Sequence, residues 1–403
     1  MHRRDLFTLP VLAMPAFGLS GCSSAELTMP EAQTAGRARP LPWPLMTLTA
    51  TLHRSTTARP GNTIWSPWSL GWALALVALG ADGRTRSEFA RVLGVSPEQA
   101  RDALEWGLAR IPRTSDKVGL EAAGRVVVRD DLSVQRSFRS DLEALSSPVG
   151  TFARGHQDDL VGELNDWVSE ATKGAIGKLF ADGAFNEQTT LVFVNALHLR
   201  TRWGHIAHEQ TVTFHGRSGD RQVSGLAMSL GSTSSHVGRS TWTGISIPLA
   251  DEDFHLVVGL PDRGSNPETV SVVELCALAG DSSKKLEDGM QVILPQWESR
   301  CRRSPKQALV DAGLVSAFDP TAARFGRMST THEPLFIQDI AHEAWIKVTE
   351  GGIEAAAATE IHVGDAAAPL PGDELVIDRP FLYAIVHAAT ATPLFVGRID
   401  ELS

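Results

Sequence analysis

The chain has 403 residues, of which 43% are hydrophobic and 21% are charged. This composition is that of a globular protein and excludes collagen, coiled coils and mainly disordered chains. The 37 Lys and Arg residues stand against 47 Asp and Glu residues, which gives a net charge of −10. No basic block interrupts this acidic balance, so we do not expect nucleic acid as a partner.

The N-terminal residues have the pattern of an export signal. The basic pair Arg3-Arg4 precedes an apolar stretch from Leu6 to Leu19, which is too short to span a bilayer as a stable helix. The end of this stretch, Leu19-Ser20-Gly21-Cys22, resembles the bacterial lipobox, in which a peptidase cuts before the Cys and the thiol carries lipid. Residues 1–21 are therefore predicted to be a lipoprotein signal peptide. A twin-arginine signal, and an ordinary signal that leaves Cys22 without lipid, both stay open.

The next segment has the composition of a tether. Residues 22–42 are rich in Ser, Ala, Pro and Gly and contain few apolar anchors, as in flexible linkers. We therefore expect an exported protein that is anchored by lipid on Cys22 to a bacterial membrane and faces outside the cytoplasm. A single domain is predicted over residues 43–403. In it, Cys276 and Cys301 either form a disulfide or stay as free thiols.

The folded part shows helical and strand patterns without a βαβ alternation. A run of apolar and small residues behind Ser66-Pro67 predicts a buried helix over 70–81, and helical spacing predicts another over 159–179. The run 191–199 predicts a central strand in which Asn195 needs hydrogen-bond partners. Further strands are expected at 245–249, 255–260 and 292–295, and helices at 267–279 and 304–315. This order predicts an α+β fold with large mixed β-sheets.

Motifs for enzyme chemistry are missing from the sequence. There is no G-x-S-x-G, G-x-G-x-x-G, P-loop, H-E-x-x-H or C-x-x-C, so we expect neither an enzyme nor a cofactor. His205, His208 and His215 lie close together, but no acidic or Cys ligand accompanies them at a recognised spacing. They are interpreted as surface or packed histidines rather than as a metal site.

The most informative segment lies near the C-terminus. Residues 344–350 alternate as in a strand, and Gly351-Gly352 is followed by Ile353-Glu354, four alanines and Thr359. A short alanine helix after the glycines is one interpretation. In the other, the glycine pair is a hinge and the small side chains slide between two strands, so that the segment is a loop in one state and a strand in another.

These residues resemble the hinge of inhibitory serpins, and the resemblance extends over nearly the whole chain from about residue 45. Segments 378–382 and 393–398 resemble the C-terminal strands of that family. Upstream matches lie in family order at 62–70, 80–85, 165–168, 172–174 and 194–196, followed by Trp203. The resemblance implies the serpin fold, in which helices surround large mixed sheets and a reactive-centre loop is exposed.

The resemblance also assigns roles to particular residues. Ser66, Ser69, Asn195 and His342 match the polar shutter beneath the main sheet, and Trp203 matches the breach where loop insertion starts. The hinge residues are Glu350, Gly352, Ile353, Glu354, Ala355, Ala356, Ala357, Ala358 and Thr359. Ile353 stands where the family usually has Thr or Ser, and its β-branched bulk is expected to slow insertion.

The mechanism implied by the resemblance is suicide inhibition of a serine protease. The protease cuts the loop and forms an acyl-enzyme, and the segment from Ile353 to Thr359 then enters the main sheet and traps the protease as a covalent complex with the monomeric inhibitor. The alternative is a non-inhibitory binding or structural protein with the serpin fold. The four small residues of the hinge favour the inhibitor.

The position of the reactive bond follows from the family's usual spacing. Counting from Glu350 puts the residue before the reactive bond near Ala366, with Ala367 or Ala368 as neighbouring alternatives. A count one residue shorter gives Asp365. Small residues at the cut favour an elastase-like or subtilisin-like protease. No Lys or Arg lies between Glu350 and Asp378, which argues against trypsin-like targets.

Overall fold

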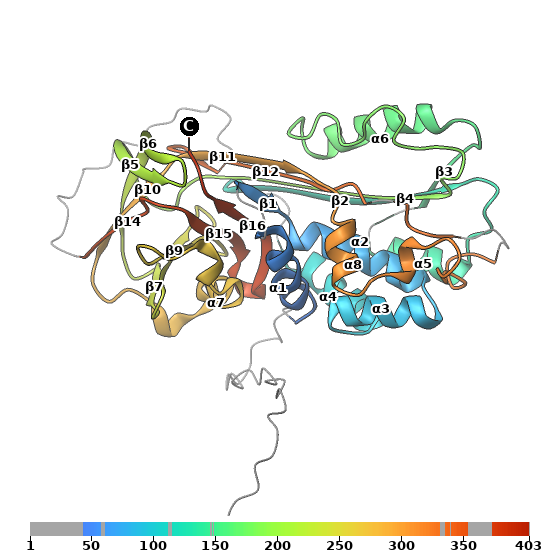
Figure 1. The fold of residues 1–403 in the computed structure, drawn as a ribbon, viewed down its shortest axis with the longest axis horizontal. Helices are drawn as coiled ribbons and strands as arrows, with labels where there is room; N and C mark the ends of the chain where they lie inside the picture. Colours follow the sequence, from blue (N-terminus) through green and yellow to red (C-terminus); the bar gives the residue numbers. More distant parts are fainter. Residues whose placement is uncertain are drawn as a thin grey trace, which may run out of the picture. The chain divides into compact units, whose positions relative to one another are not determined.

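Figure 1 shows the fold as a computed structural model, which describes residues 43–57, 61–111, 115–145, 147, 149–330, 335–338, 340–353 and 373–402. Pro40–Ser403 forms one compact unit. The predicted signal peptide and tether lie outside the described residues, and their boundaries stay predictions. Among the described helices, none is long and apolar enough to cross a membrane.

The predicted helix over 70–81 is confirmed as α2 (Pro67–Gly80), and it begins three residues earlier than expected. The reason is its N-cap. The hydroxyl of Ser66 accepts a hydrogen bond from the Ser69 N–H (3.0 Å), and Pro67 occupies the first turn, where no N–H is needed. Every residue of α2 except Ala73 is buried, so the helix forms the centre of the molecule.

The other predicted helices are present but shorter. The pattern over 159–179 forms α6 (Gln157–Ala171), which ends because Lys173 and Gly174 take left-handed backbone angles (φ 52° and 85°). The pattern over 267–279 is interrupted by the extended residues Val270 and Ser271. The pattern over 304–315 is helical only over 306–311, and Gly313 follows with φ 100°.

The remaining helices surround α2 and the sheets. The α-helices are α1 (Trp43–Thr57), α3 (Gly83–Leu93), α4 (Pro97–Leu108), α5 (Arg136–Ala144), α7 (Val272–Ala277) and α8 (Lys306–Asp311). The 3-10 helices are η1 (Pro267–Thr269), η2 (Leu278–Gly280), η3 (Ser282–Lys284), η4 (Ser316–Phe318) and η5 (Ala388–Thr390).

The strands form three sheets, of which the first is antiparallel and the other two are mixed, and the α+β class is confirmed. The first has the order β1 (Thr63–Trp65), β16 (Thr392–Ile399), β15 (Phe381–His387), β9 (Phe254–Pro261), β8 (Trp242–Pro248) and β7 (Ser235–Gly238). The second has the order β14 (Asp373–Val376), β10 (Met290–Pro295), β6 (Gly219–Leu230) and β5 (Ala207–Gly216). The third has the order β11 (Trp297–Arg302), β12 (Glu343–Thr349), β13 (Gly352–Ile353), β4 (Leu191–Thr201), β2 (Val118–Arg129) and β3 (Val149–Phe152). All four predicted strands are confirmed, in β4, β8, β9 and β10.

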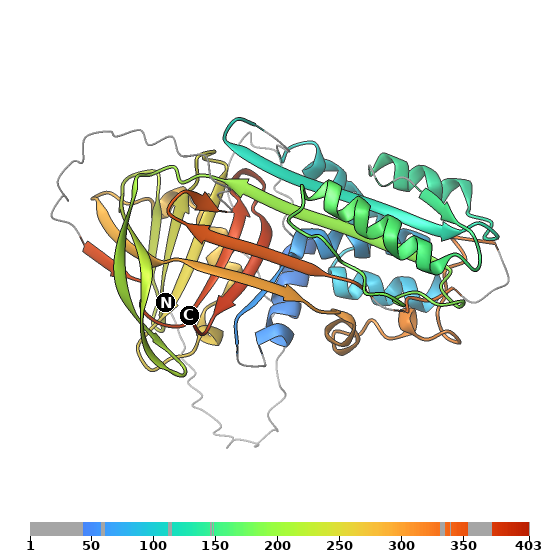
Figure 2. The ribbon, with the colours of Figure 1, turned by 90° about the horizontal axis from the view of Figure 1, so that it is seen from above.

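The third sheet, called the main sheet below, has helices on both faces, with α6 lying over part of one of them (Figures 1 and 2). Strand β4 shows the period of two that this requires. Val192, Val194 and Ala196 pack in the cluster beneath α6. Leu197 and Leu199 belong to the core that includes α2. The main sheet therefore lies between α6 on one side and the central helix on the other.

Candidate functional site

The predicted hinge begins inside the main sheet. Strand β13 lies between β12 and β4: Ile353 is paired with Val348 on one side and with Thr201 on the other. Its side chain is 1% exposed. The sequence predicted that Ile353 enters the sheet only after cleavage, and this part of the prediction is wrong for the conformation described here. Burial of an apolar side chain stabilises the folded state, which explains why Ile353 lies in the sheet before any cleavage.

Gly352 makes this arrangement possible. Its φ of 129° lies in a region that other residues rarely adopt, and a Cβ built on it would lie 2.3 Å from the carbonyl oxygen of Thr201. Any side chain at this position would push the hinge away from β4. The glycine that the sequence suggested as a hinge is therefore required for both the turn and the close approach of two backbones.

The four residues predicted to form a polar cluster lie together. The Ser66 N–H donates to Nε2 of His342 (3.0 Å), and the hydroxyl of Ser69 donates to Oδ1 of Asn195 (2.5 Å). With the cap bond between the two serines, these contacts join the start of α2, the middle of β4 and the residue before β12. The Asn195 Nδ2 atom is buried and has no hydrogen-bond partner among the described residues.

Burial controls the charge of His342. The residue is 9% exposed, and burial lowers the pKa of its imidazole from the ordinary 6.5 to about 4. At neutral pH the ring is therefore neutral, which agrees with Nε2 acting as an acceptor for the Ser66 N–H. Protonation would remove this acceptor and place a charge at the centre of the molecule.

Trp203 joins the ends of two strands. It follows β4, is 8% exposed, and its Nε1–H donates to the carbonyl oxygen of Thr349 at the end of β12 (2.8 Å). The indole thus fixes the place where the chain turns from β12 into β13. The sequence did not reveal Thr349 as the partner, because a backbone carbonyl has no signature in the residue types.

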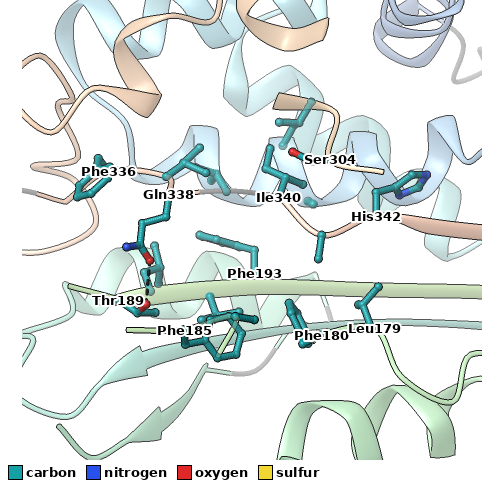
Figure 3. Close-up of a pocket in the computed structure, with 18 of the residues that line it drawn as sticks. Leu179, Phe180, Phe185, Thr189, Phe193, Ser304, Phe336, Gln338, Ile340 and His342 are labelled. Carbon is teal, nitrogen blue, oxygen red and sulfur yellow. Dashed lines mark hydrogen bonds between the residues drawn. The ribbon is translucent and has the colours of Figure 1, made fainter. Parts of the chain in front are cut away.

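A cavity of about 330 Å³ touches the polar cluster. Figure 3 shows it between the start of β4, represented by Phe193, and the segment that carries Gln338, Ile340 and His342. One hydrogen bond crosses its wall, from the hydroxyl of Thr189 to Oε1 of Gln338 (2.8 Å). The cavity therefore lies on the line between β4 and the chain that leads into β12.

The other predicted site residues are placed as follows. Glu350 lies exposed in the turn between β12 and β13. Cys276 and Cys301 are free thiols, which decides between the two alternatives, and burial raises the pKa of Cys276 to about 12. Within the described ranges, no three His, Cys, Asp or Glu side chains are grouped so that they would hold a metal ion. Several predictions fall outside the described residues: those for Cys22, Glu354, Ala355, Ala356, Ala357, Ala358, Thr359, Ala366 and Ala367.

Comparison with known proteins agrees with this architecture. The model of the family described as Serpin (serine protease inhibitor) matches residues 46–402. Serpin B10 of Otolemur garnettii is 26% identical and aligns over 85% of this chain and 94% of its own length. Human serpin B9 is 27% identical over 84% of this chain and 93% of its own length.

Solved structures show the same fold. Native tengpin, a thermophilic serpin, has a TM-score of 0.78 at 22% identity and covers 89% of this chain and 94% of its own. Uncleaved ovalbumin has a TM-score of 0.76 at 22% identity, with 91% and 100% covered. The chain belongs to the serpin family, whose members are mostly protease inhibitors and not enzymes.

The buried state of His342 predicts a pH dependence of stability. Because its pKa is lowered in the folded protein, the unfolded chain binds the proton more readily, and stability is lost as the pH falls from 6.5 to 4. His342→Gln keeps an acceptor for the Ser66 N–H and removes the titration. We expect urea unfolding to show that the wild-type protein loses about 3 kcal/mol more than the variant over this range. Parallel losses would contradict the assignment, because His53 and His255 titrate in both proteins.

Proposed function

We propose that this serpin is a suicide inhibitor of serine proteases that traps its target by inserting the cleaved loop into the main sheet. The observation that carries the proposal is the place of β13, which shows β12 and β4 already accepting two residues of the hinge between them. A non-inhibitory serpin that never inserts its loop is the alternative. The small side chains that follow Ile353 favour insertion.

The register of β13 indicates how insertion would continue. Ile353 pairs with Thr201, and each further loop residue would pair with the preceding residue of β4. Ala357 would then lie opposite Leu197, whose side chain faces the core, and Thr359 would lie opposite Asn195. The hydroxyl of Thr359 would reach the buried Nδ2 of Asn195, which has no partner among the described residues.

The cavity supports the same direction of insertion. Its walls include Val192 and Phe193 of β4 on one side and Ala341 and His342 on the other. A strand that continued past Asn195 would run between these walls. The cavity thus lies where the last inserted residues would need room, near the start of β4.

The chemistry of trapping is that of an interrupted peptide hydrolysis. The hydroxyl oxygen of the protease's serine attacks the carbonyl carbon of Ala366, the bond from Ala366 to Ala367 breaks, and the new amino group of Ala367 leaves with the proton that the protease's histidine returns. An ester joins the two proteins. Insertion carries the protease away before water attacks the ester. Small residues at the bond favour an elastase-like or subtilisin-like target.

The N-terminal sequence pattern supports an activity outside the cytoplasm. We propose that the protein is exported and acts as a monomer anchored to a bacterial membrane by lipid on Cys22. The support is the Leu19-Ser20-Gly21-Cys22 motif and the tether-like composition of residues 22–42. An inhibitor held in this way would meet proteases at the cell surface.

Reaction with proteases tests the inhibitory function. With an elastase-like protease or subtilisin, we expect a complex that survives denaturing electrophoresis. The released fragment should have the mass of a peptide that begins at Ala367. Cleaved protein should melt about 10 °C or more above the uncut form, because insertion adds a row of ladder hydrogen bonds and 1 kcal/mol shifts the Tm of a large domain by about 2 °C. A trypsin-like protease is the control and should give no complex. Cleavage without complex or gain in Tm would identify a non-inserting serpin.

A charge on the inserting face should convert the inhibitor into a substrate. In the proposed register Ala357 faces the core, so Ala357→Arg would bury an unpaired charge during insertion. We expect the fraction of encounters that ends in complex to fall by about tenfold or more, with the variant cleaved instead, as measured by densitometry of the reaction products. Ala357→Ser, which is small and neutral, should behave as the wild-type protein. Normal trapping by the Arg variant would reject the register.

Substitution of Cys22 tests the anchor. Cys22→Ser should move the protein from the membrane fraction to the soluble fraction and abolish the incorporation of a labelled fatty acid. Cys301→Ser is the matched control, since it removes a thiol within the folded part and should leave the protein in the membrane fraction. A Cys22→Ser variant that stays on the membrane would exclude the lipid anchor.

A further inference from the structure

A row of four side chains crosses the main sheet on its α6 face, three residues along β12 and β4 from the point where Ile353 ends β13. Arg300 of β11 lies opposite Trp345 of β12, and His198 of β4 lies opposite Glu121 of β2. Trp345 and His198 meet in the middle. We call Arg300, Trp345, His198 and Glu121 the cross-sheet row.

The middle contact of the row joins the two halves of the sheet. The rings of His198 and Trp345 are stacked, with their centroids 6.5 Å apart and 10° between their planes. Over the described residues β12 and β4 are not paired with each other directly, and only β13 lies between them at the top. The stack therefore connects two strands that no backbone ladder connects at this level.

The indole of Trp345 is fixed on its own side of the sheet. Its Nε1–H donates to Oε1 of Glu298 (2.9 Å), and the guanidinium carbon of Arg300 lies 5.7 Å from the ring centroid. Arg300 also donates to Oε1 of Glu343 (2.7 Å) and to the carbonyl oxygen of Ala175 (2.9 Å). With its edge bonded and one face near a cation, the ring has little freedom to turn away from His198.

The other end of the row is tied to the same segment after α6. Glu121 forms an ion pair with Nζ of Lys173, and its second oxygen lies 3.4 Å from Nδ1 of His198. Lys173 and Ala175 are two residues apart, and each contacts a different half of the sheet. The segment after α6 therefore links the two ends of the cross-sheet row, one on β2 and the other on β11.

The charge state of His198 is compatible with stacking at neutral pH. Burial lowers the pKa of its imidazole, Glu121 opposes this shift, and Arg200 and Lys173 act with burial. The ring facing Trp345 is therefore mainly neutral at pH 7.

A strand that continued β13 would meet the row at once. In the register of Ile353 with Val348 and Thr201, the third further residue comes between Trp345 and His198. Strands that flank an inserted strand lie about 9.5 Å apart. The two rings, whose centroids are 6.5 Å apart, would therefore have to separate as β12 and β4 move to this spacing. We propose that the stack of His198 on Trp345 holds the two halves of the sheet together and sets the rate of loop insertion. This inference rests on the insertion mechanism proposed above.

Uptake of a synthetic peptide measures insertion without any protease. A labelled peptide of residues 353–366 would be mixed with the purified protein, and its uptake followed by fluorescence anisotropy. Trp345→Leu and His198→Ala remove the stack, and we expect uptake to become roughly three- to tenfold faster, the range of an aromatic pair. His198→Phe keeps a stacking ring and should stay within about twofold of the wild-type rate.

A matched control separates the effect of losing the stack from the effect of losing a tryptophan elsewhere. Trp106 is half-buried in α4 and lies beneath a guanidinium, that of Arg110 at 4.3 Å from the ring centroid, but it belongs to none of the strands of the main sheet. Trp106→Leu should leave uptake unchanged. Combining Trp345→Leu with His198→Ala should accelerate uptake no more than either change alone, because one contact is lost in all three variants.

The outcomes distinguish this inference from the proposed function. Wild-type uptake that the stack variants do not accelerate, or a His198→Phe variant as fast as His198→Ala, overturns the role of the row and leaves insertion standing. No uptake by the wild-type protein or any variant, together with no gain in Tm on cleavage, overturns both.

Discussion

The gap between β12 and β4 is the constraint on which the rest of the structure depends. A sheet gains its stability from backbone ladders, and among the described residues β13 supplies a ladder at one end of the gap, through Ile353. Below that point the two halves are joined by side chains. On the core side the joint is the polar cluster at His342 and Asn195. On the α6 side it is the stack of Trp345 on His198.

The polar cluster and the stack respond differently to the loss of one partner. The polar cluster depends on neutral donors and acceptors at fixed distances, so removing one partner leaves a buried polar atom without a hydrogen bond. The stack depends on the contact of two flat surfaces and tolerates exchange of one ring for another. In the proposed mechanism the sheet stays closed until cleavage and then opens, and contacts that are individually weak and jointly sufficient suit such a change.

Much of this architecture follows from the sequence, for local reasons. Ser66-Pro67 ahead of an apolar run specifies the start of α2, and the apolar run at 191–199 specifies β4. The polar cluster was found by family resemblance, which carries residue roles but no distances. The cross-sheet row was not predicted, because His198 and Trp345 become neighbours only through the register of separate strands. The early burial of Ile353 was missed as well, since it depends on the turn at Gly352.

One consequence follows from the double role of Ser66. Its hydroxyl caps α2, while its own N–H is held by a side chain from the other layer of the molecule, Nε2 of His342. The first amides of most helices exchange their hydrogens freely with water. Ser66 is 1% exposed. Its N–H loses the hydrogen bond to His342 only when the chain leading into β12 moves away from the helix. Exchange of this single backbone hydrogen would therefore report each movement of the chain that leads into β12, even when α2 itself stays folded.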